Sequence, residues 1–343
     1  MAKDNAYKEA EKKIAEALQS GATELDLCDM KLTELPESIG QLKQLRKLDL
    51  GRDYSKDVKD KNQLTALPSS LGQLTQLTSL NLSSNQLTTL PPSLGQLTQL
   101  TKLDFSSNKL TALPDSLALA QLTQLTSLDF SNNQLTTLPE SLGQLTQLTN
   151  LYLSNNQLTI LPESLGKLIN LTRLEIRDNL FTILPDPIKN LNNLQIFYFS
   201  CPTLKSIPPW YGQLRNLTVI DLTGLSLTSV PEWLRDFKRL IHLFLDNNQL
   251  TTIPAWISNI VLDFGVLHLD GNPLNPALQS VYDSCSEGKY EPLWAYLRSL
   301  ETNAEPLYEA KLVLVGEGNV GKTTLLKALK GKAGEAPQEH VPT

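Results

Sequence analysis

The sequence predicts an α/β solenoid, a curved parallel sheet built from stacked repeats and covered at both ends by helices. Two observations lead to this prediction. Most of the chain fits the pattern L-x-x-L-x-L-x-x-N-x-L-x-x-L-P, and the final proline recurs in most units every 23 residues. Apolar residues at helical spacing occur on both sides of the repeats. We therefore expect about eleven units of 23 residues.

The spacing within each unit explains how the units stack. In L-x-L, both leucines point to one side of a short strand, so stacked strands place a leucine column on the inner face of a parallel sheet. The asparagine follows the strand, where its carboxamide can bond backbone groups that the turn leaves unpaired. Proline suits the convex side, because no sheet hydrogen bond there requires an N–H.

A few units depart from the pattern. One gap between prolines holds nine extra residues within 51–61, and another holds two extra residues near 117–121, so both predict loops. Two neighbouring units carry Pro202 and Leu225 in place of the asparagine. The turn there must satisfy its backbone in another way, and we expect a local distortion of the array.

We divide the chain into four parts: residues 1–21 as an N-terminal capping helix, 22–275 as the repeat array, 276–306 as C-terminal capping helices and a linker, and 307–343 as the start of another domain. Covering helices are expected because the ends of a repeat array expose apolar edges. The first helix is expected to bury one face, formed by Tyr7, Ala10, Ile14 and Leu18. The last is expected to bury Leu293, Trp294, Leu297 and Leu300.

Composition excludes several classes of partner. The net charge is −6 and no basic tract occurs, which argues against a nucleic-acid surface or an anionic membrane surface. No apolar run approaches the roughly 18 residues of a membrane helix. The three cysteines, Cys28, Cys201 and Cys285, show neither metal-ligand nor disulfide spacing. We expect a cytoplasmic protein.

A phosphate-binding motif lies near the end of the sequence. Residues 316–323, GEGNVGKT, match G-x-x-x-x-G-K-[ST], between an apolar β-rich run at 311–315 and an amphipathic helix pattern at 323–330. Backbone N–H groups and the helix N-terminus would cradle phosphates, while the Thr323 hydroxyl would bind Mg²⁺. The predicted phosphate-binding residues are Gly316, Gly318, Asn319, Val320, Gly321, Lys322, Thr323 and Thr324.

Residues 22–274 resemble the leucine-rich-repeat family, in which the concave sheet face is the usual recognition surface. Outward strand positions of the early units carry polar residues or opposite charges two apart, such as Lys47 with Asp49 and Lys102 with Asp104, which solvated pairing explains. From the sixth unit they become aromatic and cationic, as in an interface hot spot. Ordinary sequence drift is the alternative. The candidate partner-binding residues are Tyr152, Arg173, Arg177, Tyr198, His242, Phe244 and His268.

The order of parts, from repeats through covering helices and a linker to KLVLV and GEGNVGKTT, resembles the Roco family of bacterial type, in which a Ras-like Roc GTPase domain follows the repeats. The resemblance implies a parent protein that binds GTP or GDP with Mg²⁺, hydrolyses GTP and dimerises through a COR domain. Thr343 stands where that family has a second Mg²⁺-binding threonine, but an ordinary tail explains it equally well.

This chain would then be the recognition or regulatory module plus a truncated start of Roc, binding a protein partner or its own Roc–COR domains. It lacks the D-x-x-G and [NT]-K-x-D elements after the loop, so we expect an inactive monomer that holds no nucleotide tightly. Two alternatives stay open. One is a pure interaction scaffold with a vestigial loop, and the other is an ATP-dependent signalling NTPase, a type that usually carries its repeats after the nucleotide domain.

Overall fold

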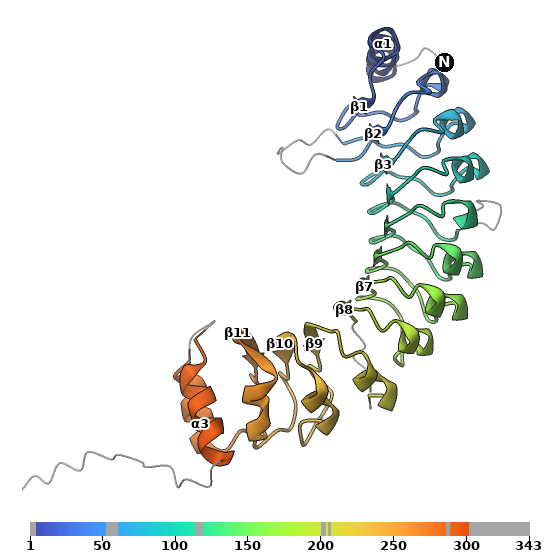
Figure 1. Ribbon diagram of the computed structural model, residues 1–343. Coiled ribbons are helices and arrows are strands. Elements are labelled where there is room, and N and C mark those ends of the chain that lie inside the picture. Colours follow the sequence, from blue (N-terminus) through green and yellow to red (C-terminus); the bar gives the residue numbers. More distant parts are fainter. Residues whose placement is uncertain are drawn as a thin grey trace, which may run out of the picture.

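The chain forms an arc of stacked units around one parallel sheet. This computed structural model describes residues 5–52, 61–113, 119–199, 204, 207–285 and 289–301. Its eleven strands are hydrogen-bonded in chain order, from β1 to β11. Figure 1 shows the strands along the inner side of the arc and short helices along the outer side. The predicted leucine-rich solenoid is confirmed.

The strands are short because each unit turns away after its second leucine. They are β1 (Glu24–Asp26), β2 (Lys47–Asp49), β3 (Ser79–Asn81), β4 (Lys102–Asp104), β5 (Ser127–Asp129), β6 (Asn150–Tyr152), β7 (Arg173–Glu175), β8 (Ile196–Tyr198), β9 (Val219–Asp221), β10 (Leu240–Phe244) and β11 (Val261–His268).

Among the described residues, the convex side carries one 3-10 helix in each of ten units. These helices are η1 (Glu37–Gln41), η2 (Ser69–Gln73), η3 (Pro92–Gln96), η5 (Leu119–Gln121), η6 (Glu140–Gln144), η7 (Glu163–Lys167), η8 (Asp186–Asn190), η9 (Pro209–Gln213), η10 (Glu232–Asp236) and η11 (Ala255–Asn259). The motif proline directly precedes nearly all of them in an extended conformation, as at Pro139 with φ −74° and ψ 148°. Proline at this point interrupts no sheet hydrogen bond.

Leucine columns fill the space between the strands and the 3-10 helices. The apolar residue at the centre of β2 to β9 is buried, as Leu128 and Leu151 illustrate with no exposed surface, whereas Leu25 at the centre of β1 is half-buried. Two stacked phenylalanines, Phe105 and Phe130, replace leucine in neighbouring units, with ring centroids 5.3 Å apart. Each unit can bury its apolar face only against the next unit, so the core is continuous along the arc.

The repeat asparagines bond backbone groups at the turns, as predicted, and they form a ladder that also links neighbouring units; six of the eight are buried and two are half-buried. The Asn133 side chain donates to the carbonyls of Phe105 and Phe130, each at 3.0 Å, and accepts from the Leu110 N–H at 3.0 Å. Each carboxamide of this ladder therefore joins the backbones of two units. The ladder consists of Asn62, Asn85, Asn108, Asn133, Asn156, Asn179, Asn248 and Asn272.

Units without the asparagine close their turn differently. In the regular units a single residue before the asparagine is left-handed, such as Ser107 with φ 56°. Where Leu225 replaces asparagine, both Gly224 and Ser226 have positive φ. Strands β8 and β9 pair through one pair of Cα partners, Ile196 and Val219, whereas β7 and β8 share three. The expected distortion is present at Leu225, while Pro202 lies outside the described residues.

Helices cover both ends of the array, with two differences from the predicted faces. Helix α1 (Asn5–Ser20) buries Ala10, Ile14 and Ala17, whereas Leu18 is 42% exposed. The buried stripe follows steps of four and then three residues, which turns Leu18 away from the first unit. At the other end, helices α2 (Pro276–Asp283) and α3 (Glu291–Glu301) pack together, and α3 packs on η11.

Helix α3 buries Leu293, Trp294 and Leu297, in agreement with the prediction. The exception is Leu300 in the last turn of α3, which is 44% exposed. No helix among the described residues has both the length and the apolar character required to cross a bilayer.

We expect Asn133→Ala to destabilise the array by about 2–4 kcal/mol, because it leaves one N–H and two carbonyls without their partner. Urea denaturation followed by circular dichroism measures this loss. Gln134→Ala is the matched control, since Gln134 is adjacent and exposed, and it is expected to change stability by less than about 0.5 kcal/mol. Equal stabilities for the two variants would show that the ladder does not hold the units together.

Candidate recognition surface

The seven predicted concave-face residues lie half-buried on the solvent-facing side of the sheet, from β6 to β11. They form two groups. We call the first the arginine–tyrosine cluster, which consists of Tyr152, Arg173, Arg177 and Tyr198 with the carboxylates Glu175 and Asp221. We call the second the histidine stack, which consists of His242, Phe244 and His268.

The parallel register brings these residues together. Cα partners on β6 and β7 are Asn150 with Arg173 and Tyr152 with Glu175, and Glu175 in turn pairs with Tyr198 on β8. Residues one repeat apart are therefore cross-strand neighbours, close enough for long side chains to touch. Side chains two strand positions off register lie on the same face and meet diagonally, which places Arg173 beside Tyr152 and Tyr198 and places Arg177 beside Tyr198.

Arg173 lies between two tyrosine rings. Its guanidinium carbon is 5.6 Å from the ring centroid of Tyr152 and 5.6 Å from that of Tyr198. Its Nε donates to Glu175 Oε1 at 2.6 Å, and the two side chains form an ion pair. Burial lowers the pKa of Arg173, but the Glu175 hydrogen bond and charge outweigh burial, so its pKa is raised overall. The guanidinium is thus held rigidly and fully charged.

Arg177 crosses the irregular part of the sheet. Its guanidinium carbon lies 4.2 Å from the Tyr198 ring centroid, and its Nη2 is 3.4 Å from Asp221 Oδ2 on β9. This contact links residues 44 positions apart and passes over β8, where pairing to β9 is weakest. Cation–π contacts of this kind contribute about 0.5–2 kcal/mol each. The cluster therefore presents aromatic and cationic groups in fixed positions.

The seven partner-binding residues predicted from the sequence do not include Glu175 and Asp221. The position of Glu175, two residues after Arg173 on one strand, was a usable signal because the two side chains share a face. Asp221 offered no such local signal, because its partner lies two units earlier in the chain.

The charged residues of the first units also pair differently from the predicted same-strand pairs. Lys47 Nζ bonds Glu24 Oε1 on the neighbouring strand at 2.6 Å rather than Asp49, since the cross-strand carboxylate is within easier reach.

The histidine stack continues the surface toward the last unit. The Phe244 ring lies between the two imidazoles, with centroids 6.0 Å from His242 and 4.5 Å from His268 and interplanar angles of 13° and 15°. Phe244 and His268 are Cα partners on β10 and β11, so the rings stack directly across strands. Stacking fixes the plane of each imidazole and leaves its nitrogens at the ring edge.

A cavity of about 420 Å³ adjoins the arginine–tyrosine cluster. It lies at the unit in which Leu225 replaces the ladder asparagine, and Asp221 forms part of its wall. Most of its lining is apolar and includes Phe197, Phe199, Leu204, Ile207 and Tyr211. The sequence signal for this cavity was the missing asparagine itself.

The first half of the concave face is acidic instead. Asp104 and Asp129 are Cα partners on β4 and β5. Burial raises the pKa of Asp129 to about 6, with a further contribution from the Asp104 charge, although the Ser131 N–H bond opposes the shift. Two surfaces of different composition thus lie on one sheet. The predicted phosphate-binding residues Gly316 to Thr324 and Thr343 lie outside the described residues.

Comparison with known proteins gives one result throughout. Family models described as "Leucine rich repeat" match residues 98–158 and 239–260, and one described as "Leucine Rich repeats (2 copies)" matches 75–119. The Leptospira interrogans leucine-rich-repeat protein LIC12759 is similar in structure, with 32% identity over 75% of each chain and a TM-score of 0.58. None of the curated proteins compared with the chain matches it significantly.

Two receptor structures are similar over part of their length. The plant peptide hormone receptor RGFR1, in complex with RGF2, is 33% identical over 70% of this chain and 38% of the receptor, with a TM-score of 0.54. PEPR1, in a structure described as PEPR1-AtPEP1, is 28% identical over 70% of this chain and 37% of that chain, with a TM-score of 0.55. This chain thus spans little more than a third of either receptor chain.

The raised pKa of Asp129 predicts how the stability of the fold depends on pH. Because the folded state raises its pKa from the ordinary 3.8 to about 6, the folded state binds a proton more tightly than the unfolded state does. Its contribution to stability is present below pH 3.8 and is lost as the pH rises through about 6. Asp129→Asn is therefore expected to be about 1–2 kcal/mol more stable than the parent chain at pH 7 and similar near pH 4.

Urea denaturation at several pH values measures this difference. Asparagine can keep the bond to the Ser131 N–H, as Asn81 does in the equivalent position by accepting from the Ser83 N–H at 2.9 Å. Ser127→Ala, on the same strand, serves as a control that leaves the carboxylate in place. A stability difference that does not change with pH would show that Asp129 titrates normally.

Proposed function

Because the chain belongs to the leucine-rich-repeat family, we propose that it is a protein-interaction module whose concave face between β6 and β11 captures a protein partner. The observation that carries this proposal is the arginine–tyrosine cluster, in which Arg173 and Arg177 are held against tyrosine rings on an open sheet face. Aromatic residues and arginines dominate binding energy at protein interfaces. Groups already held in place lose little conformational freedom on binding.

The composition of the two halves of the face supports this location. The acidic half, around Asp104 and Asp129, consists of polar and charged side chains. The half from β6 onward combines three aromatic residues with two arginines and two histidines. RGFR1 is in complex with RGF2, and the PEPR1 structure is described as PEPR1-AtPEP1, which agrees with a recognition role for an array of this kind. The occupant we propose is a protein, either a separate partner or other domains of the parent chain.

The phosphate-loop motif leads to a finer proposal about the parent protein. We propose that this array is the recognition module of a Roco-type GTPase located in the cytoplasm, in which GTP or GDP with Mg²⁺ binds at Gly316 to Thr323. This proposal rests on the motif and its flanking pattern. A pure interaction scaffold with a vestigial loop, or an ATP-dependent signalling NTPase, remains the alternative. Dimerisation of the parent through a COR domain belongs to the same proposal.

The concave surface is tested by quantitative capture from an extract of the source cells. We expect Arg173→Glu with Arg177→Glu, and separately Tyr198→Ala with Phe244→Ala, to reduce recovery of the captured protein at least tenfold, because they remove the anchors of the interface. Lys102→Glu is the matched control, because Lys102 occupies on β4 the position that Arg173 occupies on β7. Thermal melts check that all variants stay folded. If Lys102→Glu abolishes capture of the partner and the other variants do not, the interface lies on the acidic half.

Nucleotide binding is tested by calorimetry with GDP, ADP and Mg²⁺. The 343-residue sequence contains neither D-x-x-G nor [NT]-K-x-D after the loop, so we expect its Kd for GDP to be weaker than about 1 mM. On a chain extended through those elements, we expect GDP to bind and ADP not to compete, with Lys322→Ala abolishing binding. ADP binding to the extended chain would favour the ATPase alternative, and binding of neither would favour the scaffold.

A further inference from the structure

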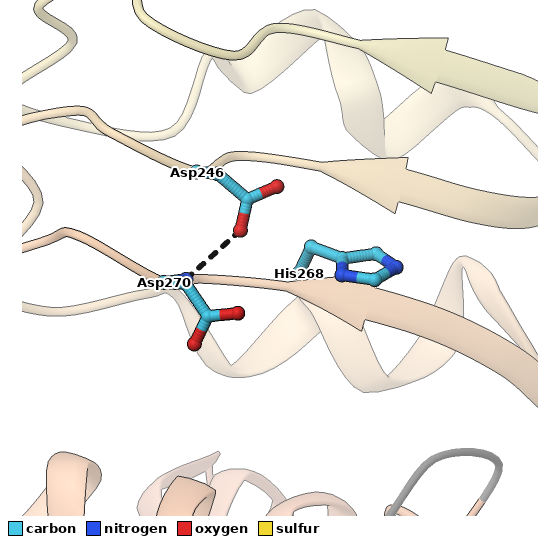
Figure 2. Close-up of side chains that lie close together, drawn as sticks. All are labelled: Asp246, His268 and Asp270. Carbon is cyan, nitrogen blue, oxygen red and sulfur yellow. Dashed lines mark hydrogen bonds between the residues drawn. The ribbon is translucent and has the colours of Figure 1, made fainter.

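We propose that Asp246, His268 and Asp270 bind one divalent transition-metal ion, such as zinc, at the last two units of the concave face. One ligand atom from each of the three side chains lies within 4.8 Å of the other two. Figure 2 shows the carboxylates of Asp246 and Asp270 extending from neighbouring chain segments toward the side on which the His268 imidazole lies. This proposal does not depend on the identity of any protein partner.

The fold itself places the three ligands. Strand β11 ends at His268, and Asp270 follows two residues later on the same side of the chain. Asp246 occupies the corresponding position after β10, one unit earlier. Its Oδ1 accepts from the Asp270 N–H at 2.9 Å, which holds the two segments together (Figure 2). Asp246 and Asp270, which are 24 residues apart in the sequence, therefore lie next to each other.

The repeat pattern does not require acids at these two positions. In four regular units the same position, directly after the second apolar residue of the L-x-L pattern, holds Ser83, Ser106, Ser131 and Ser154, and a later unit holds Thr223. Units ten and eleven instead carry aspartates, directly beside a histidine. Two carboxylates this close repel each other in the absence of a cation. An acidic pair also occurs at Asp104 and Asp129, but no imidazole accompanies it among the described residues.

His268 is oriented for such a role. Its ring stacks on Phe244 at 4.5 Å, which fixes the ring plane while its nitrogen atoms stay at the edge. Asp246 and His268 are half-buried, while Asp270 is exposed, so an ion can enter from solvent. One imidazole nitrogen with two carboxylate oxygens suits zinc or a similar transition metal, whereas Mg²⁺ and Ca²⁺ prefer oxygen ligands alone. Three protein ligands leave further coordination positions for water.

The test is calorimetric titration of ZnCl₂ into the full chain, freed of metal and of any histidine tag, with its three cysteines changed to serine. We expect one site with a Kd in roughly the micromolar range. His268→Phe keeps the stacking but removes the nitrogens, so we expect at least a tenfold loss of affinity, as for Asp246→Asn and Asp270→Asn. His242→Phe is the matched control on the other side of Phe244, with less than about a twofold change expected.

Histidine-selective NMR identifies the ligand directly, because the chain has only three histidines. Substoichiometric Mn²⁺ is expected to broaden the His268 imidazole signals and to leave those of His242 sharp by comparison. The proposal is overturned if zinc does not bind saturably, if His268→Phe binds zinc as the parent chain does, or if Ca²⁺ binds as tightly as zinc. Thermal melts in EDTA establish that each variant is folded. If one variant unfolds, the other two ligand variants still decide the result.

Discussion

The asparagine ladder is the interaction on which the rest of this structure depends. Each carboxamide bonds a carbonyl of its own unit, a carbonyl of the unit before it and an N–H of that earlier unit, as Asn156 does with Leu153, Phe130 and Leu135. These bonds satisfy buried backbone groups that lie beyond the sheet ladder. They also fix how far each unit advances relative to the previous one. Leucine burial drives the stacking, but it is not directional and would allow one unit to shift slightly against the next. The hydrogen bonds of the ladder need a narrow range of distances and angles, so they prevent such shifts.

This fixed step turns sequence periodicity into surface chemistry. Residues one repeat apart become neighbours across strands, so each outward position forms a row along the arc. Changing the residue type along a row changes the character of the surface without altering the scaffold. One sheet thereby carries the acidic pair at Asp104 and Asp129, the arginine–tyrosine cluster and the histidine stack with its carboxylates. The leucines behind them are nearly identical throughout.

The backbone of the array is least regular beside the arginine–tyrosine cluster. At Leu225 the ladder is interrupted, Gly224 and Ser226 both become left-handed, and β8 meets β9 through one pair of Cα partners. The cavity opens at this point, and Asp221 in its wall forms an ion pair with Arg177, which follows β7. Side-chain contacts on the concave face thus connect two parts of the sheet that the backbone connects only weakly. Recognition residues and the structural defect occupy the same few units.

The sequence by itself determined the solenoid, its strand positions, its asparagine ladder and the side of the sheet on which Arg173 and Tyr198 lie, because all of these follow from a repeated local pattern. Only the tertiary structure decided which side chains contact one another. The pairing of Arg177 with Asp221, the burial of Ala17 in place of Leu18, and the meeting of Asp246 with His268 and Asp270 depend on the stacking angle and on rotamers. Those distances arise from packing between units, which periodicity within a unit does not encode.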